Sequence, residues 1–129
     1  MPISRLANLI DGRLVPPLAD RWLDVFEPAT GEPFAECPDA DASDVAMAVA
    51  AAQRAAPGWA ATPIERRALL LQRLADRVEA RLDEFAALES RDSGKPVRLA
   101  RSVDIPRAVS NLRFFAAASD VPRHEPKGA

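Results

Sequence analysis

Apolar residues in the middle of the chain recur every three or four positions, which is the spacing of one helix face. The members of this stripe are Leu71, Leu74, Val78, Leu82, Phe85 and Leu88. The arginines between positions 66 and 81 fall mostly on other faces. We expect the stripe to face a core, and the basic flank to be either solvated or a docking surface for a partner. The span 63–93 is long for one globular helix, so we expect a break near Ala80.

Start and stop signals frame this helical region. Thr62, followed three residues later by Glu65, predicts a capping box with Pro63 at the first helical position. Gly94 suits the left-handed position that ends a helix, and Pro96 prevents the helix from continuing. We therefore expect helix ends at both sides of the region.

Two further helices are expected. The acidic segment 38–44 favours the N-terminus of a helix that begins near Ser43, and the alanine-rich run 45–56 continues it until Pro57. Asp104, just before Ile-Pro, predicts the N-cap of a last helix, which continues over residues 108–118.

The N-terminal third has strand signals. Residues 6–15 place Asp11-Gly12 between two apolar runs, which favours a β-hairpin with a two-residue turn. Segments 22–26 and 34–37 are two further short strand candidates, each bounded by proline. Because proline lacks the amide donor of a β ladder, we expect short or edge strands.

These elements predict an α+β fragment. Antiparallel β hairpins over residues 6–37 precede three to four α-helices over residues 43–118, and a polar tail, 119–129, is expected to fray. Apolar residues make up 48% of the 129 residues, but much of this is alanine and only 5% of the chain is aromatic. We therefore expect a thin core.

Charge and cysteine content narrow the function classes. The net charge is −2, from 17 basic and 19 acidic residues that are interspersed, so no basic stripe indicates nucleic-acid binding. The single cysteine, Cys37, excludes an intramolecular disulfide and fits a reducing cytosol. No apolar run is long enough for a membrane span, and the first residues do not resemble a signal peptide. We expect a cytoplasmic protein that binds neither membranes nor nucleic acids.

Candidate catalytic and metal residues are few. Cys37 and His124 form a nucleophile and base only if the tail docks on the β region; otherwise Cys37 is a half-buried strand residue and His124 an exposed one. Asp39, Asp41 and Asp44 are too few and too closely spaced for a calcium loop, so we interpret them as helix-capping residues.

Phosphate binding is not indicated either. None of the five glycines belongs to a G-x-G-x-x-G or G-K-[ST] motif, and in Gly94-Lys95-Pro96 a proline replaces the hydroxyl residue. From the residues alone we assign no catalytic and no cofactor-binding residue.

Five short motifs occur in a fixed order over residues 8–118. They are Asn8–Gly12, Glu27–Glu32, Ala48–Trp59, Glu65–Asp76 and Glu89–Pro96. They resemble "-ING-", "NPATGE", "AAxxAFxxW", "ERxxxLxxLAD" and "ExxDxGKP" of the N-terminal portion of the NAD(P)-dependent aldehyde dehydrogenase superfamily. Segments 99–108 and 111–116 are most similar to 2-hydroxymuconic and 2-aminomuconic semialdehyde dehydrogenases.

The resemblance implies that this chain is an incomplete part of the aldehyde dehydrogenase fold. The family's catalytic cysteine, glutamate and asparagine and its Rossmann-type cofactor site lie beyond the matched segment, and Cys37 does not match that cysteine. NAD or NADP is implied for the complete enzyme, and none for this chain alone. The tail, 123–129, resembles the strand that enters the cofactor domain, although family members usually have a longer connection before it.

The resemblance also implies one metal site. Many members hold a structural monovalent cation with backbone carbonyls and an aspartate, and the matching positions are Val25, Phe26 and Asp104. Oxygen ligands suit a hard cation. Asp104 as a plain helix N-cap remains the alternative interpretation.

Two functional hypotheses follow. In the first, the chain is the N-terminal part of an aldehyde dehydrogenase that oxidises an aldehyde, for example a muconic semialdehyde, to the acid, and is inactive alone. In the second, it is an interaction module or truncated paralogue that docks on a partner chain without catalysis. The expected partners are the remainder of the enzyme, a paralogous chain or a second copy. A decayed gene product is the third possibility.

Overall fold

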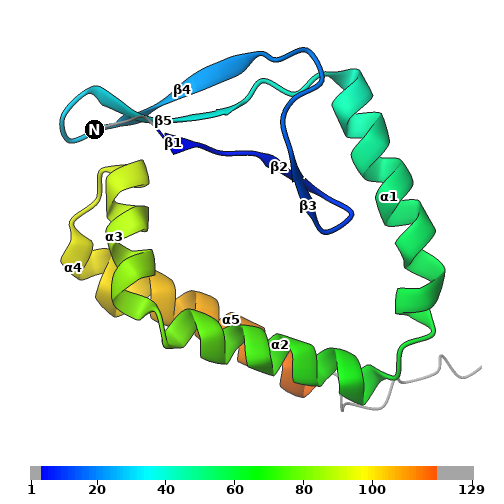
Figure 1. Cartoon of the computed structure of the whole chain (residues 1–129). Helices are drawn as coiled ribbons and strands as arrows, with labels where there is room; N and C mark the ends of the chain where they lie inside the picture. Colours follow the sequence, from blue (N-terminus) through cyan, green and yellow to red (C-terminus); the bar gives the residue numbers. More distant parts are fainter. Residues whose placement is uncertain (1–3, 119–129) are drawn as a thin grey trace, which may run out of the picture. The chain divides into compact units, whose positions relative to one another are not determined.

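The computed structural model describes residues 4–118, which divide into two compact units (Figure 1). The first unit contains the residues up to Ala61 together with Ser90–Gly94. The second contains Thr62–Glu89 and the residues from Lys95 onward. The predicted order of β strands followed by helices is confirmed. Within residues 4–118, no helix has both the length and the apolar character that a membrane crossing needs.

A three-stranded sheet forms the centre of the first unit. Its order is β1 (Ser4–Arg5), β5 (Glu32–Pro38) and β4 (Trp22–Glu27). Strands β4 and β5 pair antiparallel, as expected for a hairpin. Strand β1 pairs in parallel with β5, and it lies outside the strands predicted from the sequence.

A separate hairpin joins β2 (Asn8–Ile10) to β3 (Arg13–Val15). Its turn is the predicted Asp11-Gly12 pair, whose φ angles of 53° and 73° are both positive. Positive φ at both central residues is the geometry that a two-residue turn needs to match the strand twist. The hairpin prediction is confirmed.

Strand β5 is longer than expected because its prolines interrupt little hydrogen bonding. Strand β1 pairs only with Ala35 and Glu36, so Pro33 and Pro38 face a single neighbouring strand. Pro33 also lies at the register shift opposite Phe26, where the ladder is already irregular.

Helix α1 (Ala42–Ala60) follows the sheet and has a complete capping box. The carboxylate of the N-cap residue, Asp41, accepts from backbone amides of the first turn, and that of Asp44 accepts from the Asp41 amide. The expected end at Pro57 is wrong, since the helix continues past it to Ala60. Pro57 lies in the last turn, where the loss of one amide donor interrupts the helix less than it would in the middle.

The C-terminal end of α3 (Leu82–Ser93) belongs to the first unit from Ser90 on. Gly94 has φ +75° and its amide donates to the Ser90 carbonyl at 2.9 Å, which confirms the predicted glycine cap. A Cβ at Gly94 would lie 2.9 Å from Cβ of Pro28 in the β4–β5 turn. Glycine is therefore required here both by its backbone angle and by its neighbour.

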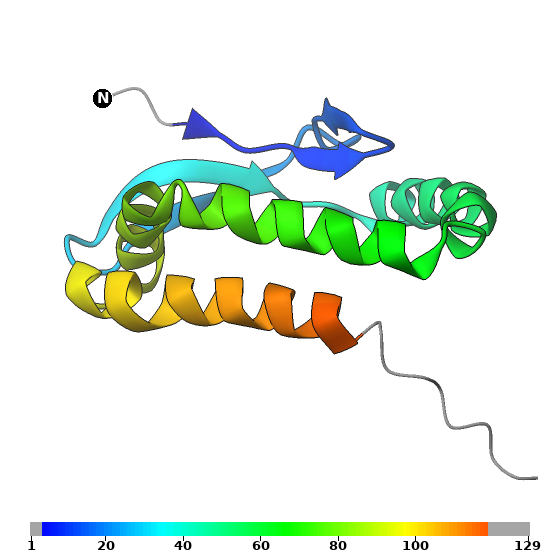
Figure 2. The same ribbon diagram turned by 90° about the horizontal axis from the view of Figure 1, so that it is seen from below.

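Helices make up the second unit. They are α2 (Ile64–Glu79), α3 up to Glu89, α4 (Val97–Leu99), η1 (Ala100–Asp104) and α5 (Ile105–Ala118). The predicted break near Ala80 is confirmed, because Ala80 caps α2. Helices α2 and α5 lie side by side and run in opposite directions (Figure 2).

The predicted capping box at the start of α2 is wrong. The N-cap residue is Pro63, whose side chain makes no capping hydrogen bond, and its carbonyl accepts from the amides of Arg66 and Arg67. The helix therefore begins one residue later than the Thr62 and Glu65 spacing implied.

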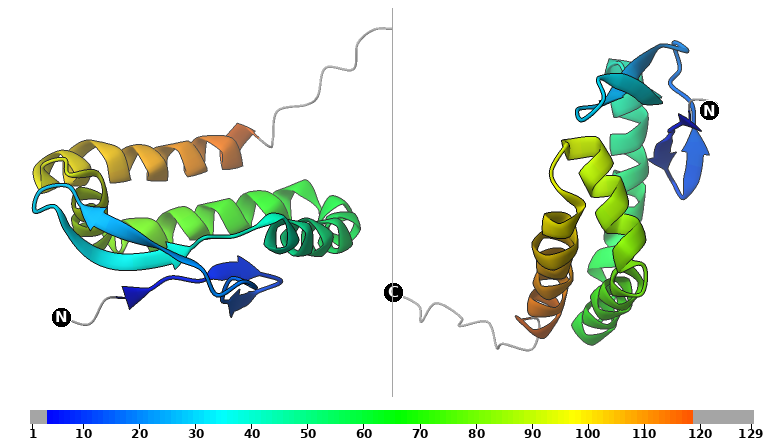
Figure 3. Two further views of the ribbon diagram at one scale, coloured as in Figure 1. Left: turned by 90° about the horizontal axis from the view of Figure 1, so that it is seen from above. Right: turned by 90° about the vertical axis from the view of Figure 1, so that its left-hand side faces the viewer.

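Asp104 is not the N-cap of a new helix, so that prediction is also wrong. Helix α4 continues through η1, a π-helical segment, directly into α5, and Figure 3 shows this unbroken helical course. Both Leu99 and Ile105, at the two ends of η1, have right-handed helical angles. Pro106 lies in the first turn of α5, where the preceding π-helical turn takes the place of a cap.

The core is thin, as the composition predicted, and alanines dominate it. Its buried apolar members are Ala35, Ala51, Ala68, Ala75, Ala86, Ala100, Ile105, Val109 and Ala116. Val78, Leu82 and Phe85 of the predicted stripe pack against part of this core. Leu74 and Leu88 of the same stripe are exposed, so the stripe is only partly covered.

Candidate functional site

Cys37 and His124 are not brought together by the structure. Cys37 is half-buried on β5, where its register partner on β4 is Leu23, and its thiol is free. His124 lies outside the described residues. No described geometry therefore supports Cys37 and His124 as a nucleophile and its base.

The interpretation of the three N-terminal aspartates as capping residues is confirmed for Asp41 and Asp44, which form the capping box of α1, and not for Asp39. Asp44 is 2% exposed, and its two carboxylate oxygens accept from the amides of Leu18 and Asp41 at 3.0 Å each. Asp39 pairs with Arg21 at 2.9 Å. Within the described part of the chain, no group of three or more histidine, cysteine, aspartate or glutamate side chains is arranged to hold a metal ion.

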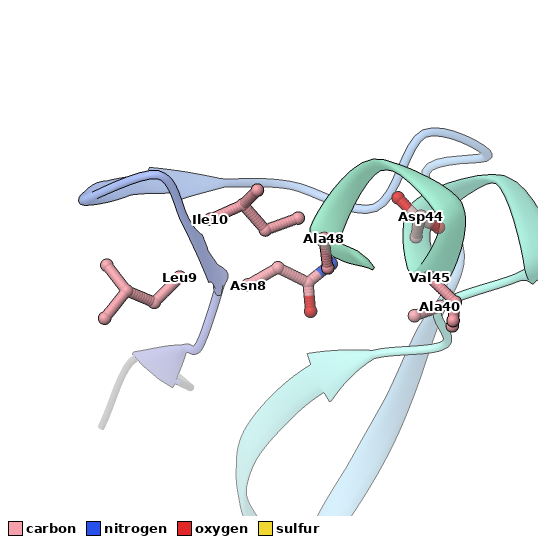
Figure 4. Close-up of a pocket in the computed structure, with 7 residues that line it drawn as sticks. All are labelled: Asn8, Leu9, Ile10, Ala40, Asp44, Val45 and Ala48. Carbon is pink, nitrogen blue, oxygen red and sulfur yellow. The ribbon is translucent and has the colours of Figure 1, made fainter. Parts of the chain in front are cut away.

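A small hollow of about 160 Å³ lies between β2 and the first turns of α1 (Figure 4). Its lining is mostly aliphatic, with two polar side chains, Asn8 and Asp44. Nδ2 of Asn8 is buried and has no hydrogen-bond partner among residues 4–118. Because the oxygens of Asp44 already accept backbone hydrogen bonds, the hollow presents one unsatisfied donor and no free base.

A charge cluster of the second unit is centred on Lys95. Its ammonium group lies 2.9 Å from Oε1 of Glu89 and 2.8 Å from Oδ2 of Asp104. The carboxylates of Asp104 and Glu89 accept hydrogen bonds from this ammonium group, which favours its charged form and raises the pKa of Lys95 above its ordinary value of 10.5. The cluster links the end of α3 to η1, and Lys95 is protonated at neutral pH, so it is no candidate base.

The residues of the implied cation site belong to different units. Val25 and Phe26 lie on β4 in the first unit, on either side of the register shift against β5. Asp104 lies in the second unit, where its carboxylate already binds the Lys95 ammonium group. The carboxylate thus suits a cation, but its charge is balanced within the second unit.

The arginines of α2 differ in how exposed their side chains are. Arg66, Arg73 and Arg77 are exposed, whereas Arg67 is half-buried and its Nε has no hydrogen-bond partner among the described residues. Arg81 pairs with Glu84 on the next helix. No signal in the sequence distinguishes Arg67 from the other arginines of this helix.

Arg113 is a further charged residue with partners that were not predicted from the sequence. Its guanidinium group pairs with Asp76 at 3.0 Å and with Glu79 at 2.6 Å, both on α2. These two hydrogen-bonded carboxylates raise the pKa of Arg113. Two acidic residues three positions apart on one helix are the signal that points to such a basic partner.

The comparisons with known proteins agree on one family. The family model described as aldehyde dehydrogenase family matches residues 15–127. The 2-aminomuconic semialdehyde dehydrogenase of Danio rerio is 46% identical over 113 residues, which cover 88% of this chain and 23% of that protein. A probable aldehyde dehydrogenase of Mycobacterium tuberculosis is 45% identical over 115 residues, 89% of this chain and 23% of that protein.

Solved structures give the same result. The structure of a putative aldehyde dehydrogenase from Burkholderia cenocepacia has a TM-score of 0.88 and 40% identity, and it covers 91% of this chain and 24% of its own. PnpE in complex with nicotinamide adenine dinucleotide has a TM-score of 0.86 and 40% identity, with 92% and 24% covered. The chain therefore spans about a quarter of the length of the relatives that it matches, and it has the fold of their N-terminal part.

Proposed function

Because the chain belongs to the aldehyde dehydrogenase family, we propose that it serves as the N-terminal part of an enzyme that oxidises an aldehyde to the acid with NAD or NADP. The observation that carries this proposal is the match of fold and sequence together, at 40% identity and a TM-score of 0.88, over nine-tenths of the chain. In this role the chain supplies helices and strands to a larger enzyme, and the reacting groups come from elsewhere.

A muconic semialdehyde is the proposed substrate class. The support is the similarity to relatives named 2-aminomuconic semialdehyde dehydrogenase, at 46% and 44% identity. The test uses the chain joined to the remainder of such a relative and compares NADH formation from a muconic semialdehyde with that from a simple aliphatic aldehyde. Faster turnover of the aliphatic aldehyde would contradict the proposed class.

We further propose that the chain alone does not oxidise aldehydes. Its only cysteine, Cys37, lies on β5 opposite Leu23 of β4, and Lys95 is held in its charged form. The purified chain, mixed with a semialdehyde and NAD, is expected to produce no NADH above a protein-free blank. NADH formation that scales with the amount of chain would overturn this proposal.

The alternative function is an interaction module that docks on a partner chain without catalysis. The observation that favours it is the number of large apolar side chains left exposed on the helices, among them Leu70, Leu74, Phe114 and Phe115. Size-exclusion chromatography with light scattering separates the cases, because dimers or larger assemblies support an obligate partner and a sharp monomer argues against one.

The cation site at Val25, Phe26 and Asp104 remains a proposal from the family resemblance, and so does the cytoplasmic location. For the site, the unfolding midpoint of the complete enzyme in potassium chloride is compared with that in choline chloride. An equal midpoint in both salts would contradict the site. Asp104→Asn is expected to remove any difference that potassium causes.

A further inference from the structure

The hollow between β2 and the first turns of α1 has the size of a small ligand site. All of its lining residues belong to the first unit, and they are Asn8, Leu9, Ile10, Ala40, Asp44, Val45 and Ala48. Its volume of about 160 Å³ is close to that of an apolar protein cavity of about 150 Å³ that binds benzene. The hollow is therefore large enough for a molecule of about six non-hydrogen atoms.

The walls of the hollow come from residues that share one side of their element. Asn8 and Ile10 are two positions apart on β2, and Asp44 and Ala48 are four positions apart on α1. Ala40 and Ala48 carry only a methyl group, so they leave space that a larger side chain at either position would fill. An apolar molecule in this space exchanges contact with water for contact with aliphatic groups.

The hollow also offers one hydrogen-bond donor. Figure 4 shows the Asn8 side chain extending from β2 toward Ala48 of α1. Its Nδ2 is buried and has no hydrogen-bond partner among residues 4–118, which is costly for a polar group. The last torsion of an asparagine side chain has a broad energy minimum, so a turn of the amide presents Nδ2 to the hollow. A ligand oxygen placed there would satisfy this donor.

Asp44 decides which charge a ligand can carry. Its side chain is 2% exposed, and its two oxygens accept from the neutral backbone amides of Leu18 and Asp41. The carboxylate therefore keeps its negative charge beside the hollow. A second negative charge would have to leave water next to the first one, which is unfavourable. The hollow thus favours a neutral molecule over a carboxylate or a phosphate.

We propose that this hollow binds a small neutral carbonyl compound, a ketone or an aldehyde of about six non-hydrogen atoms. The carbonyl oxygen accepts from Nδ2 of Asn8, and the aliphatic part contacts Ile10 and Val45. A carbonyl oxygen brings no donor of its own, so it leaves no new polar hydrogen to be satisfied. The binding is non-covalent and the hollow holds no reacting group, so this inference goes beyond the proposed function and does not rest on it.

The experiment titrates the full chain, labelled with ¹⁵N and with ¹³C at alanine methyl groups, with 2-pentanone and follows it by NMR. The Asn8 side-chain amide and the Ala48 methyl group are expected to shift, with half-saturation at about 1 mM for a ligand of this size. The side-chain amide of Asn111, an exposed residue of α5, is the internal control and should not shift.

Two further ligands test the chemical class. Butanoate has the same number of non-hydrogen atoms as 2-pentanone but carries a negative charge, so it is expected to bind at least about tenfold more weakly. 2-Pentanol adds a donor and should also bind more weakly than the ketone. Equal or tighter binding of butanoate would overturn the preference for neutral molecules, and equal or tighter binding of 2-pentanol would overturn the carbonyl class.

Substitutions locate the site. Ala48→Leu fills the hollow and is expected to abolish the saturable shift of the Asn8 amide. Ala46→Leu, at an exposed position of the same helix, is its control and should bind as the unsubstituted chain does. Asn8→Leu removes the donor and is expected to weaken binding about fivefold, the contribution of one hydrogen bond, whereas Asn111→Leu should not. Tryptophan fluorescence during unfolding checks that each variant is folded.

A second measurement uses the chain joined to the remainder of the Danio rerio 2-aminomuconic semialdehyde dehydrogenase, without NAD. Saturation transfer from this polypeptide to 2-pentanone is expected to fall in Ala48→Leu and to stay unchanged in Ala46→Leu. Equal transfer in both variants would overturn the inference. So would the absence of a saturable shift at Ala48 in the chain itself up to about 20 mM ketone, twenty times the expected constant.

Discussion

The two units are stabilised in different ways. The first is held by interactions that involve the backbone: a β ladder, a two-residue turn with positive φ, the capping box of α1 and the close contact of Gly94 with Pro28. The second is held by side chains, namely alanines packed between α2 and α5 and ion pairs around Lys95 and Arg113. Backbone interactions leave short local signals in the sequence, whereas side-chain packing depends on what covers each helix face.

Tryptophan fluorescence can separate the two units in an experiment. The chain has two tryptophans, Trp22 and Trp59, and both belong to the first unit. Far-ultraviolet circular dichroism reports helices, most of which belong to the second unit. Unfolding followed by both signals therefore shows which unit a substitution affects.

The largest effect is expected for Ala75→Leu. Ala75 is fully buried between α2 and α5, and a leucine there forces the helices apart at a cost of about 3 kcal/mol. In urea titrations the circular-dichroism midpoint should fall more than the fluorescence midpoint. The exposed Ala117→Leu is the control and should change neither. An equal fall of both midpoints after Ala75→Leu would show that the two units unfold together.

Asp44→Ala tests the first unit in the same way. It removes a buried carboxylate and leaves the Leu18 and Asp41 amides without their acceptor, which should cost about 2 kcal/mol. Here the fluorescence midpoint is expected to fall. Asp24→Ala, at an exposed position of β4, should leave it unchanged. If only the circular-dichroism midpoint falls, the prediction that the Asp44 carboxylate stabilises the first unit is contradicted.

Gly94→Ala should have a smaller effect, about 1 to 2 kcal/mol, because the new Cβ meets a strained φ and the Pro28 ring. Gly58→Ala is the matched control. No atom lies within 4 Å of its added Cβ and its helical backbone accepts alanine, so it should stabilise slightly. Both are measured by fluorescence-monitored unfolding. Equal midpoints for the two variants would show that the contact with Pro28 does not constrain the fold.

The smallest effect is a pH dependence at Lys95. Its pKa is raised in the folded state by Asp104 and Glu89, so its stabilising contribution is complete below 10.5 and is lost as the pH rises through the folded pKa. Lys95→Met should therefore have a circular-dichroism midpoint that changes less between neutral and strongly alkaline pH. Lys95→Arg, which keeps its charge, serves as the control. If the unfolding midpoint of Lys95→Met falls at alkaline pH as much as that of the unsubstituted chain, groups other than Lys95 cause the pH dependence.

Local signals allowed much of the first unit to be predicted. The hairpin turn at Asp11-Gly12 and the cap at Gly94 depend on residue types that tolerate positive φ, and both predictions are confirmed. The extent of α1 past Pro57 was not predictable, because a proline in a last helical turn removes little hydrogen bonding. Strand β1 is only two residues long, and a parallel partner leaves no turn signal in the sequence.

The second unit was harder to predict. The periodicity of Leu74 and Leu88 predicted burial, yet both are exposed, because periodicity identifies an apolar face and cannot say what covers it. Asp104 looked like a helix cap because it precedes Ile-Pro, but a π-helical turn carries the backbone through this position. The Lys95 cluster joins residues up to 15 positions apart, a pairing that the linear pattern of charges does not specify.

The π-helical segment η1 makes the length of the chain before α5 adjustable. A π-helical turn contains one residue more than an α-helical turn, so deleting one residue from Ala100–Asp104 can restore a regular α-helix and keep the phase of α5. An inserted residue cannot be compensated in this way. It would rotate every later side chain by about 100° around the helix axis. Chains of this kind should therefore differ by one-residue gaps at this point more readily than within α5.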